Sequence, residues 1–164
     1  MGKIAFLFAG QGSQAPGMGR ELAENYECAA KTFDEATDAL GFDVKDMIFN
    51  GDKETLMITE NTQPTIVTMS VAALRVLTEE GIKPDVVAGL SLGEYTAHVA
   101  SGSLDFKDAV KLVRKRGKYM QEEVPVGKGA MAAILGLTAD EVRKAAKEAS
   151  DIGVCTGANF NCPG

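Results

Sequence analysis

The stretch "DVVAGLSLGEYTAHVASG", residues 85–102, decides the fold and the chemistry that we expect of this chain. A short β-branched run ends at Gly89, as in a buried strand, and a helical pattern then continues to Gly102. Between them stands Gly89-Leu90-Ser91-Leu92-Gly93, a G-x-S-x-G motif. In a strand–turn–helix context the glycines permit a sharp turn that projects the serine at a helix N-terminus. The stretch therefore predicts that Ser91 is a nucleophile beside amides that can stabilise an oxyanion; the alternative is an ordinary helix start.

The base that such a serine needs is not obvious, because the chain holds a single histidine, His98. If the residues after Ser91 are helical, the seven residues to His98 span about 10.5 Å. A base must lie within about 3 Å of the hydroxyl that it deprotonates. We therefore expect His98 to be structural, packing beside Val99, and the base to follow far downstream, outside these 164 residues.

The composition is that of a soluble globular domain: of 164 residues, 45% are hydrophobic and 24% charged. A net charge of −6 argues against a general nucleic-acid binder, although a local cationic site can still bind an anion. Three cysteines without a C-x-x-C pair suit a reducing compartment. The N-terminal apolar stretch is too short for a signal peptide and no run has transmembrane length, so we expect a cytoplasmic protein without a membrane partner.

The pattern along the chain alternates strands and helices, which predicts an α/β fold with a parallel sheet. A strand is expected at 4–9, a glycine-rich loop at 10–19, one or two helices at 20–40 and short helices and turns at 43–59. Pro64 is expected to open a helix with a wide apolar face, ended by Gly81 and Pro84. Asp105 is expected to cap a further helix that runs to about residue 122.

The linker "EVPVGKG", residues 123–129, is the best internal boundary, and we expect one subdomain at 1–124 and another at 125–164. Beyond it the pattern is β-α-β, with strands at 130–136 and 152–158 around a capped helix at 138–149. The chain then stops at Pro163 and Gly164, turn residues that normally lead into another element. We therefore expect the second unit to be incomplete and the chain to be truncated.

The loop "GQGSQA", residues 10–15, fits the G-x-G-x-x-A pattern of dinucleotide sites. Such a site also needs an immediate helix, which Pro16 and Gly17 interrupt, so nucleotide binding is disfavoured. Gln11 follows a strand, and from the strand end its amide can point into the same crevice as Ser91.

Arg116 differs from its basic neighbours in "KLVRKRGK", residues 111–118. Helical spacing places it with Leu112, Val113 and Met120 at the edge of the apolar stripe, whereas most of the lysines share a solvated side. An arginine on the buried side of a helix requires an anion, which is either an acidic side chain of the protein or a ligand.

Six ordered blocks together resemble the N-terminal half of the malonyl-CoA:acyl-carrier-protein transacylases, members of the acyltransferase family of fatty-acid and polyketide synthesis. The blocks are "GQGSQ" at 10–14, "NTQPT" at 61–65, "GLSLGEY" at 89–95, "LVRKRGKYMQE" at 112–122, "GAMAAILGL" at 129–137 and "NFNCPG" at 159–164. The resemblance implies an α/β-hydrolase-like large subdomain and the start of a ferredoxin-like small one. It also implies that a C-terminal half with the catalytic histidine is a missing partner.

The resemblance further implies that Ser91 carries the malonyl group between malonyl-CoA and acyl carrier protein, without a metal or prosthetic group. The implied oxyanion hole is Gln11 with the Leu92 amide, and the implied substrate-binding residues are Arg116, Gln63, Asn159 and Asn161. Two positions depart from the family pattern: Leu90 replaces the usual histidine and Cys162 a common serine.

The sequence thus predicts a malonyl transferase whose 164-residue chain is inactive alone. Two other functions stay open: a serine hydrolase or thioesterase with the same turn, and a non-catalytic fragment that binds carrier protein. An inward-facing Arg116 disfavours the hydrolase.

Overall fold

The computed structural model describes residues 2–125 and 127–162, so Pro163 and Gly164 lie outside the described residues. The chain divides into two compact units, residues 1–126 and residues 127–164.

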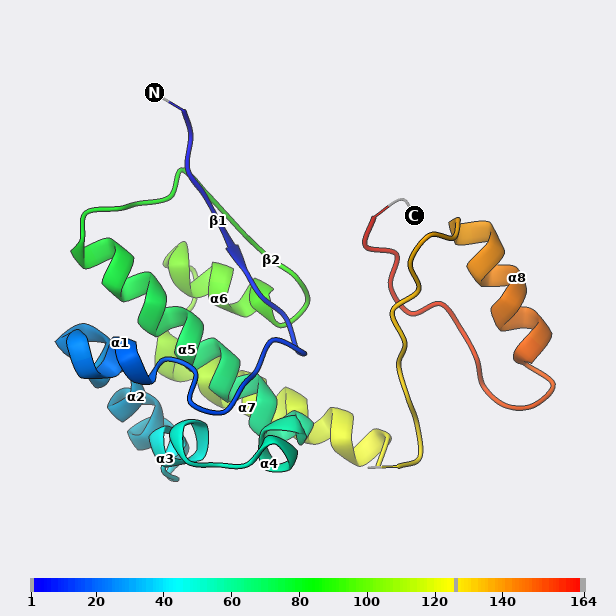
Figure 1. The fold of residues 1–164 in the computed structure, drawn as a ribbon, viewed down its shortest axis with the longest axis horizontal. Helices are drawn as coiled ribbons and strands as arrows, with labels where there is room; N and C mark the ends of the chain where they lie inside the picture. The colour runs from blue at the N-terminus through cyan, green and yellow to red at the C-terminus, as the bar shows by residue number, and fades with distance from the viewer. Residues whose placement is uncertain (1, 126, 163–164) are drawn as a thin grey trace. The chain divides into compact units, whose positions relative to one another are not determined.

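The first unit contains a parallel pair of strands, β1 (Ala5–Phe8) and β2 (Val86–Gly89), as the pattern predicts (Figure 1). Their register pairs Ala5 with Val86 and Phe8 with Gly89. Both carboxyl ends therefore lie at one edge of the sheet, where the crevices of parallel α/β sheets form.

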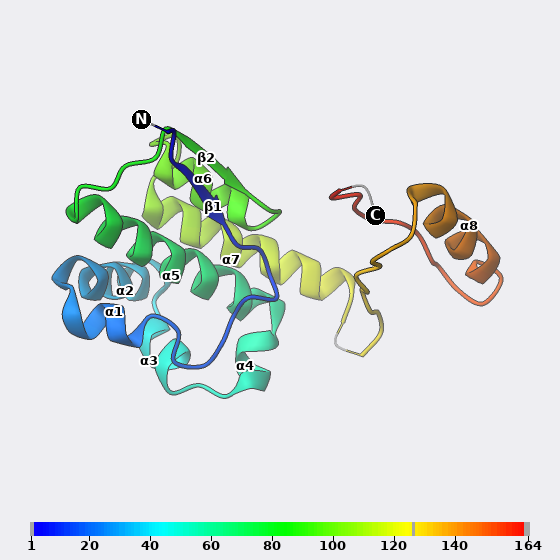
Figure 2. The ribbon, with the colours of Figure 1, turned by 45° about the horizontal axis from the view of Figure 1, so that its top comes forward.

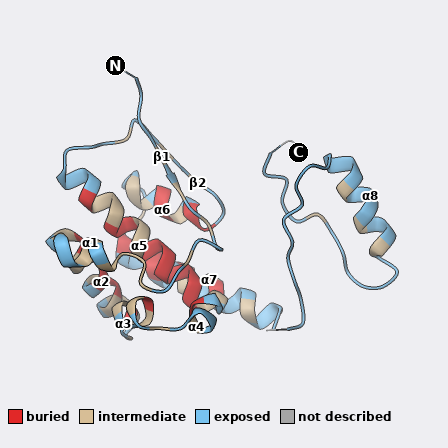
Figure 3. Ribbon diagram, in the orientation of Figure 1, coloured by how far each residue is buried: buried red, intermediate tan, exposed pale blue. Residues whose placement is uncertain are grey.

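Seven helices are described in the first unit. They are α1 (Arg20–Asn25), α2 (Glu27–Leu40), α3 (Val44–Phe49), α4 (Lys53–Met57), α5 (Thr59–Glu79), α6 (Gly93–Ala100) and α7 (Phe106–Glu123). The core lies mainly among α2, α5 and α7, while the two strands are largely exposed (Figure 3). As expected, residues 20–40 form two helices and Asp105 caps α7. Among the described residues, no helix has the length and apolar character needed to cross a membrane.

The expected start of the long helix at Pro64 is wrong, because α5 begins at Thr59 and Pro64 lies inside it. Proline has no amide hydrogen, so the carbonyl of Glu60, four residues earlier, loses its helical partner. Arg114 of α7 replaces that partner, since its Nη1 donates a hydrogen bond of 2.8 Å to the Glu60 oxygen. The same guanidinium also donates to the side chain of Asn61. A contact between two helices thus permits the proline.

Helices α5 and α7 run side by side (Figures 1 and 2), and Gly117 of α7 lies against the backbone at the start of α5. A Cβ atom on Gly117 would lie 2.8 Å from the Cα atom of Glu60 and 2.8 Å from the carbonyl oxygen of Thr59. No larger residue fits at this distance without displacing a backbone. The crossing fixes the relative position of Gln63 on α5 and Arg116 on α7.

In the second unit the described regular element is α8 (Ala139–Ala149), which has the expected cap. Thr138 and Glu141 form a reciprocal capping box at its start. The strands expected at 130–136 and 152–158 are wrong, because neither segment pairs with another strand in the described residues. Their apolar side chains are exposed, with Leu135 at 84% and Ile152 at 93%. An apolar pattern alone does not make a strand without neighbours to complete a sheet.

The close crossing predicts an unusual response to Gly117→Ala. Alanine normally stabilises an exposed helix interior relative to glycine, but here its Cβ would overlap the start of α5. We expect the free energy of unfolding of the chain to fall by about 1–3 kcal/mol in chemical denaturation. Gly153→Ala is the control, since a Cβ there meets nothing within 4 Å. Equal stabilities of the two variants would contradict a close approach at Gly117.

Candidate active site

The turn that carries Ser91 is held in a conformation that a serine rarely adopts. Its φ angle is 50°, the only positive φ of a non-glycine residue in the part of the chain that the structure describes. Such backbone strain costs about 1–3 kcal/mol and persists only where the surroundings impose it. Here the surroundings are two close approaches: a Cβ on Gly89 would collide with the backbone of Gly93, and one on Gly93 with the carbonyl of Phe8. The G-x-S-x-G motif is therefore a requirement of packing.

The sheet edge brings Gln11 and Leu92 to the same end of the two strands. Phe8 pairs with Gly89, and Gln11 and Leu92 each follow their strand by three residues. Leu92 precedes the first residue of α6, and among the described residues its amide donates no hydrogen bond. The Gln11 side chain is held by Thr59, whose Oγ1 accepts a hydrogen bond of 3.3 Å from Gln11 Nε2. Both residues thus lie just beyond the carboxyl ends of the paired strands, where the sequence predicts the oxyanion hole.

Arg116 contacts Ser91 directly, because its Nη2 donates a hydrogen bond of 3.3 Å to Ser91 Oγ. Its Nη1 donates to Gln63 Oε1 at 2.9 Å. Gln63 is fully buried, and its Nε2 contacts the Met120 sulfur at 3.1 Å. The ring of Tyr95 lies under the guanidinium, 5.7 Å from Arg116 Cζ to the ring centroid. The expected inward position of Arg116 is confirmed.

All of these partners of Arg116 are neutral. In residues 2–125 and 127–162 no carboxylate lies within ion-pair distance of its guanidinium. Its neighbour Arg114 lies 3.5 Å from the Glu60 carboxylate, and Arg75 lies 2.6 Å from that of Glu35. A half-buried arginine without an acidic partner keeps its charge available for an anionic ligand.

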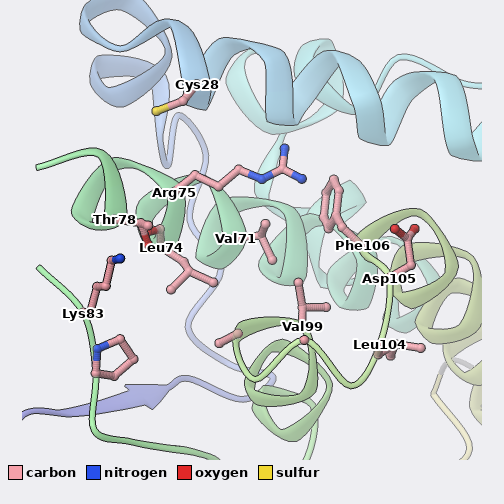
Figure 4. A pocket seen from close by; sticks show the side chains of 13 residues that line it. Cys28, Val71, Leu74, Arg75, Thr78, Lys83, Val99, Leu104, Asp105 and Phe106 are labelled. Atoms are coloured by element: carbon pink, nitrogen blue, oxygen red, sulfur yellow. The ribbon is translucent and has the colours of Figure 1, made fainter. Parts of the chain in front are cut away.

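A second arginine, Arg75, lines a hollow elsewhere in the first unit (Figure 4). This hollow has a volume of about 780 Å³ and is lined by residues of α2, α5, α6 and α7 and of the loops between them. Arg75 points toward Phe106 there, and its guanidinium lies 5.0 Å from the ring centroid. Glu35 neutralises Arg75, so this arginine differs from Arg116, which has no acidic partner among the described residues.

His98 does not contact the nucleophile. It lies in the last turn of α6, five residues beyond the first, which is about 7.5 Å of helical rise. The expectation that it packs beside Val99 is wrong, because its side chain is 53% exposed and lies 3.9 Å from the Glu94 carboxylate. An i, i+4 pairing on the helix surface accounts for its position better than burial does.

Asn159 and Asn161 lie in the second unit, where both are exposed, and their part in the site stays a prediction. Leu90, which replaces the histidine of the resembled family, is 57% exposed beside the backbone of Gly10. Sequence reasoning missed Tyr95. Its signal was its place four residues after Ser91, which puts it on the same face of the turn and helix.

A strained serine turn at the end of a parallel strand, beside an arginine without an acidic partner among the described residues, is the arrangement expected of an acyl-transferring site. The acyl transferase domain family matches residues 5–159, and the chain belongs to this family.

More particularly, the chain is similar to malonyl CoA-acyl carrier protein transacylase of Bacillus subtilis, with 52% identity over 100% of the chain and 52% of the relative. The crystal structure of this transacylase from Clostridium perfringens matches with a TM-score of 0.90 and 45% identity, over 99% of the chain and 52% of that protein. A malonyl-transacylase in complex with a type II polyketide acyl-carrier protein matches with a TM-score of 0.92 and 44% identity, over 99% of the chain and 53% of that protein. The chain thus spans about half the length of these relatives.

Proposed function

We propose that the chain supplies the nucleophile and the acyl-binding half of an enzyme that transfers a malonyl group from coenzyme A to acyl carrier protein in fatty-acid biosynthesis. The observation that carries the proposal is Arg116, a cation with neutral partners whose Nη2 touches Ser91 Oγ. The similarity to malonyl-transacylases over the whole chain supports it.

In the first step Ser91 Oγ attacks the thioester carbonyl of malonyl-CoA and its proton passes to a base. The Leu92 amide and the Gln11 side chain stabilise the oxyanion of the tetrahedral intermediate. When the intermediate collapses, the carbon–sulfur bond breaks and the coenzyme A thiol leaves with the proton. The carrier-protein thiol then attacks the malonyl-serine ester in the same way and restores the Ser91 hydroxyl.

Arg116 selects the substrate by its carboxylate. A guanidinium and a carboxylate match in two parallel hydrogen bonds, and an acetyl group offers nothing to this cation. Acetyl-CoA would leave the charge desolvated and unpaired, which lowers its reactivity relative to malonyl-CoA. The same property disfavours a lipase or thioesterase acting on simple acyl chains.

His98 is not the base in this proposal, because its Nε2 lies 3.9 Å from the Glu94 carboxylate on the helix surface. The chain spans about half the length of its relatives, and the proposal assigns the base to the half that it does not cover. In this proposal residues 1–124 form the N-terminal part of an α/β-hydrolase-like subdomain and residues 125–164 the first part of a ferredoxin-like one. The resemblance adds Asn159 and Asn161, which belong to the latter, to the proposed substrate-binding residues. Without the base the serine stays protonated, and the chain alone transfers malonyl groups very slowly.

The acylated residue can be identified by mass spectrometry. A full-length protein that contains this chain, incubated with malonyl-CoA, should gain a malonyl adduct on the peptide that contains Ser91, and Ser91→Ala should abolish it. His98→Ala is the control and should keep the adduct, since His98 is exposed and remote. An adduct on a cysteine, or one that persists in Ser91→Ala, would sink the proposal.

Substrate selection can be measured with Arg116→Ala in the same protein. We expect kcat/KM for malonyl-CoA to fall about 100-fold, because the lost charge-assisted pair is worth roughly 3 kcal/mol. Acetyl transfer should change little or improve. Lys115→Ala, which removes an exposed cation from the same helix, should affect neither substrate. Equal losses of malonyl and acetyl transfer in Arg116→Ala would show that Arg116 is structural.

A further inference from the structure

We infer that Tyr95 is a positioning residue for the substrate-binding arginine: its ring holds the Arg116 guanidinium against Ser91 without neutralising it. This inference rests on the proposed function for its consequence in catalysis, but the geometry that carries it does not. Tyr95 stands in the first turn of α6, four residues after the nucleophile, and its ring centroid lies 5.7 Å from Arg116 Cζ.

A long arginine side chain needs support to present its charge at one place. A carboxylate partner would neutralise the arginine, as Glu60 does for Arg114 and Glu35 does for Arg75. Two partners hold Arg116 without neutralising it. Gln63 Oε1 accepts a hydrogen bond from Arg116 Nη1, and the negative face of the Tyr95 ring lies against the guanidinium. The edge that carries Nη2 is left for Ser91 and for a ligand on it.

The strained turn at Ser91 and the crossing of α5 and α7 determine this arrangement together. Ser91 and Tyr95 belong to one turn and one helix, so the ring moves with the nucleophile. Gln63 is fully buried and joined to α7 through Met120, so its amide moves with the helix that carries Arg116. Tyr95 therefore keeps the guanidinium near Ser91, while Gln63 fixes the position of Nη1.

A second aromatic–cation pair on α7 provides a matched comparison. Lys115 Nζ lies 5.5 Å from the ring centroid of Tyr119, whose side chain is 56% exposed. An exposed pair of this kind contributes little, because water competes for the cation. Tyr119→Leu therefore removes an equal ring from the protein without touching the site.

The test is a set of variants of a full-length protein that contains this chain: Tyr95→Phe, Tyr95→Leu, Tyr119→Leu, Arg116→Ala and the double variant Tyr95→Leu/Arg116→Ala. Tyr95→Leu should raise KM for malonyl-CoA about 5- to 10-fold and leave acetyl transfer within about twofold, since the lost cation–π contact acts only through the charge. Tyr95→Phe keeps the ring face and should stay within about twofold of the parent, as should Tyr119→Leu. In the Arg116→Ala background, Tyr95→Leu should have no further effect on malonyl transfer.

Equal losses for both acyl groups in Tyr95→Leu, or an undiminished effect without Arg116, would overturn the inference. If Arg116→Ala itself does not separate malonyl from acetyl transfer, the proposed function fails instead. Crystal structures of the same variants then decide on Tyr95 independently. The inference requires that the Arg116 side chain leaves Ser91 in Tyr95→Leu and keeps its place in Tyr95→Phe; an unmoved Arg116 in Tyr95→Leu contradicts it.

Discussion

The close crossing of α5 and α7 at Gly117 is the constraint on which the site depends. There the backbone of α7 at Gly117 lies against the start of α5. Pro64 cannot donate a hydrogen bond to the Glu60 carbonyl, and Arg114 of α7 donates one instead. Because the two helices are locked at this point, Gln63 meets Arg116 at 2.9 Å. Arg116 is thus positioned by a residue three positions beyond the contact in α5, and not by an acidic partner.

The second constraint is the strained turn at Ser91, which brings the serine to the same arginine that the helix crossing positions. Packing of Gly93 under Phe8 holds the turn, and the turn places Ser91 Oγ within 3.3 Å of Arg116 Nη2. Sequence reasoning predicted both ends of this contact, because each depends on local rules. The G-x-S-x-G motif after a strand defines the turn, and the helical period sets the side of α7 on which Arg116 lies.

The parts that sequence reasoning missed depend on contacts between distant segments. Pro64 marks a helix start in isolation, and only Arg114 on another helix makes an interior position tolerable. The apolar pattern at 130–136 and 152–158 matches buried strands, but a strand exists only where a partner pairs with it. The spacing of Tyr95 from Ser91 places it near the serine turn, but no local pattern links it to an arginine 21 positions further along the chain.

The central claim is that Arg116, held by neutral partners, binds the carboxylate of the acyl group on Ser91. The most direct measurement is a crystal structure of a full-length protein that contains this chain, trapped with the malonyl group on Ser91. The account predicts the carboxylate within about 2.7–2.9 Å of the Arg116 guanidinium, with the Gln63 contact kept. A malonyl carboxylate bound to another cation, or turned to solvent while Arg116 remains on Ser91 Oγ, would contradict it.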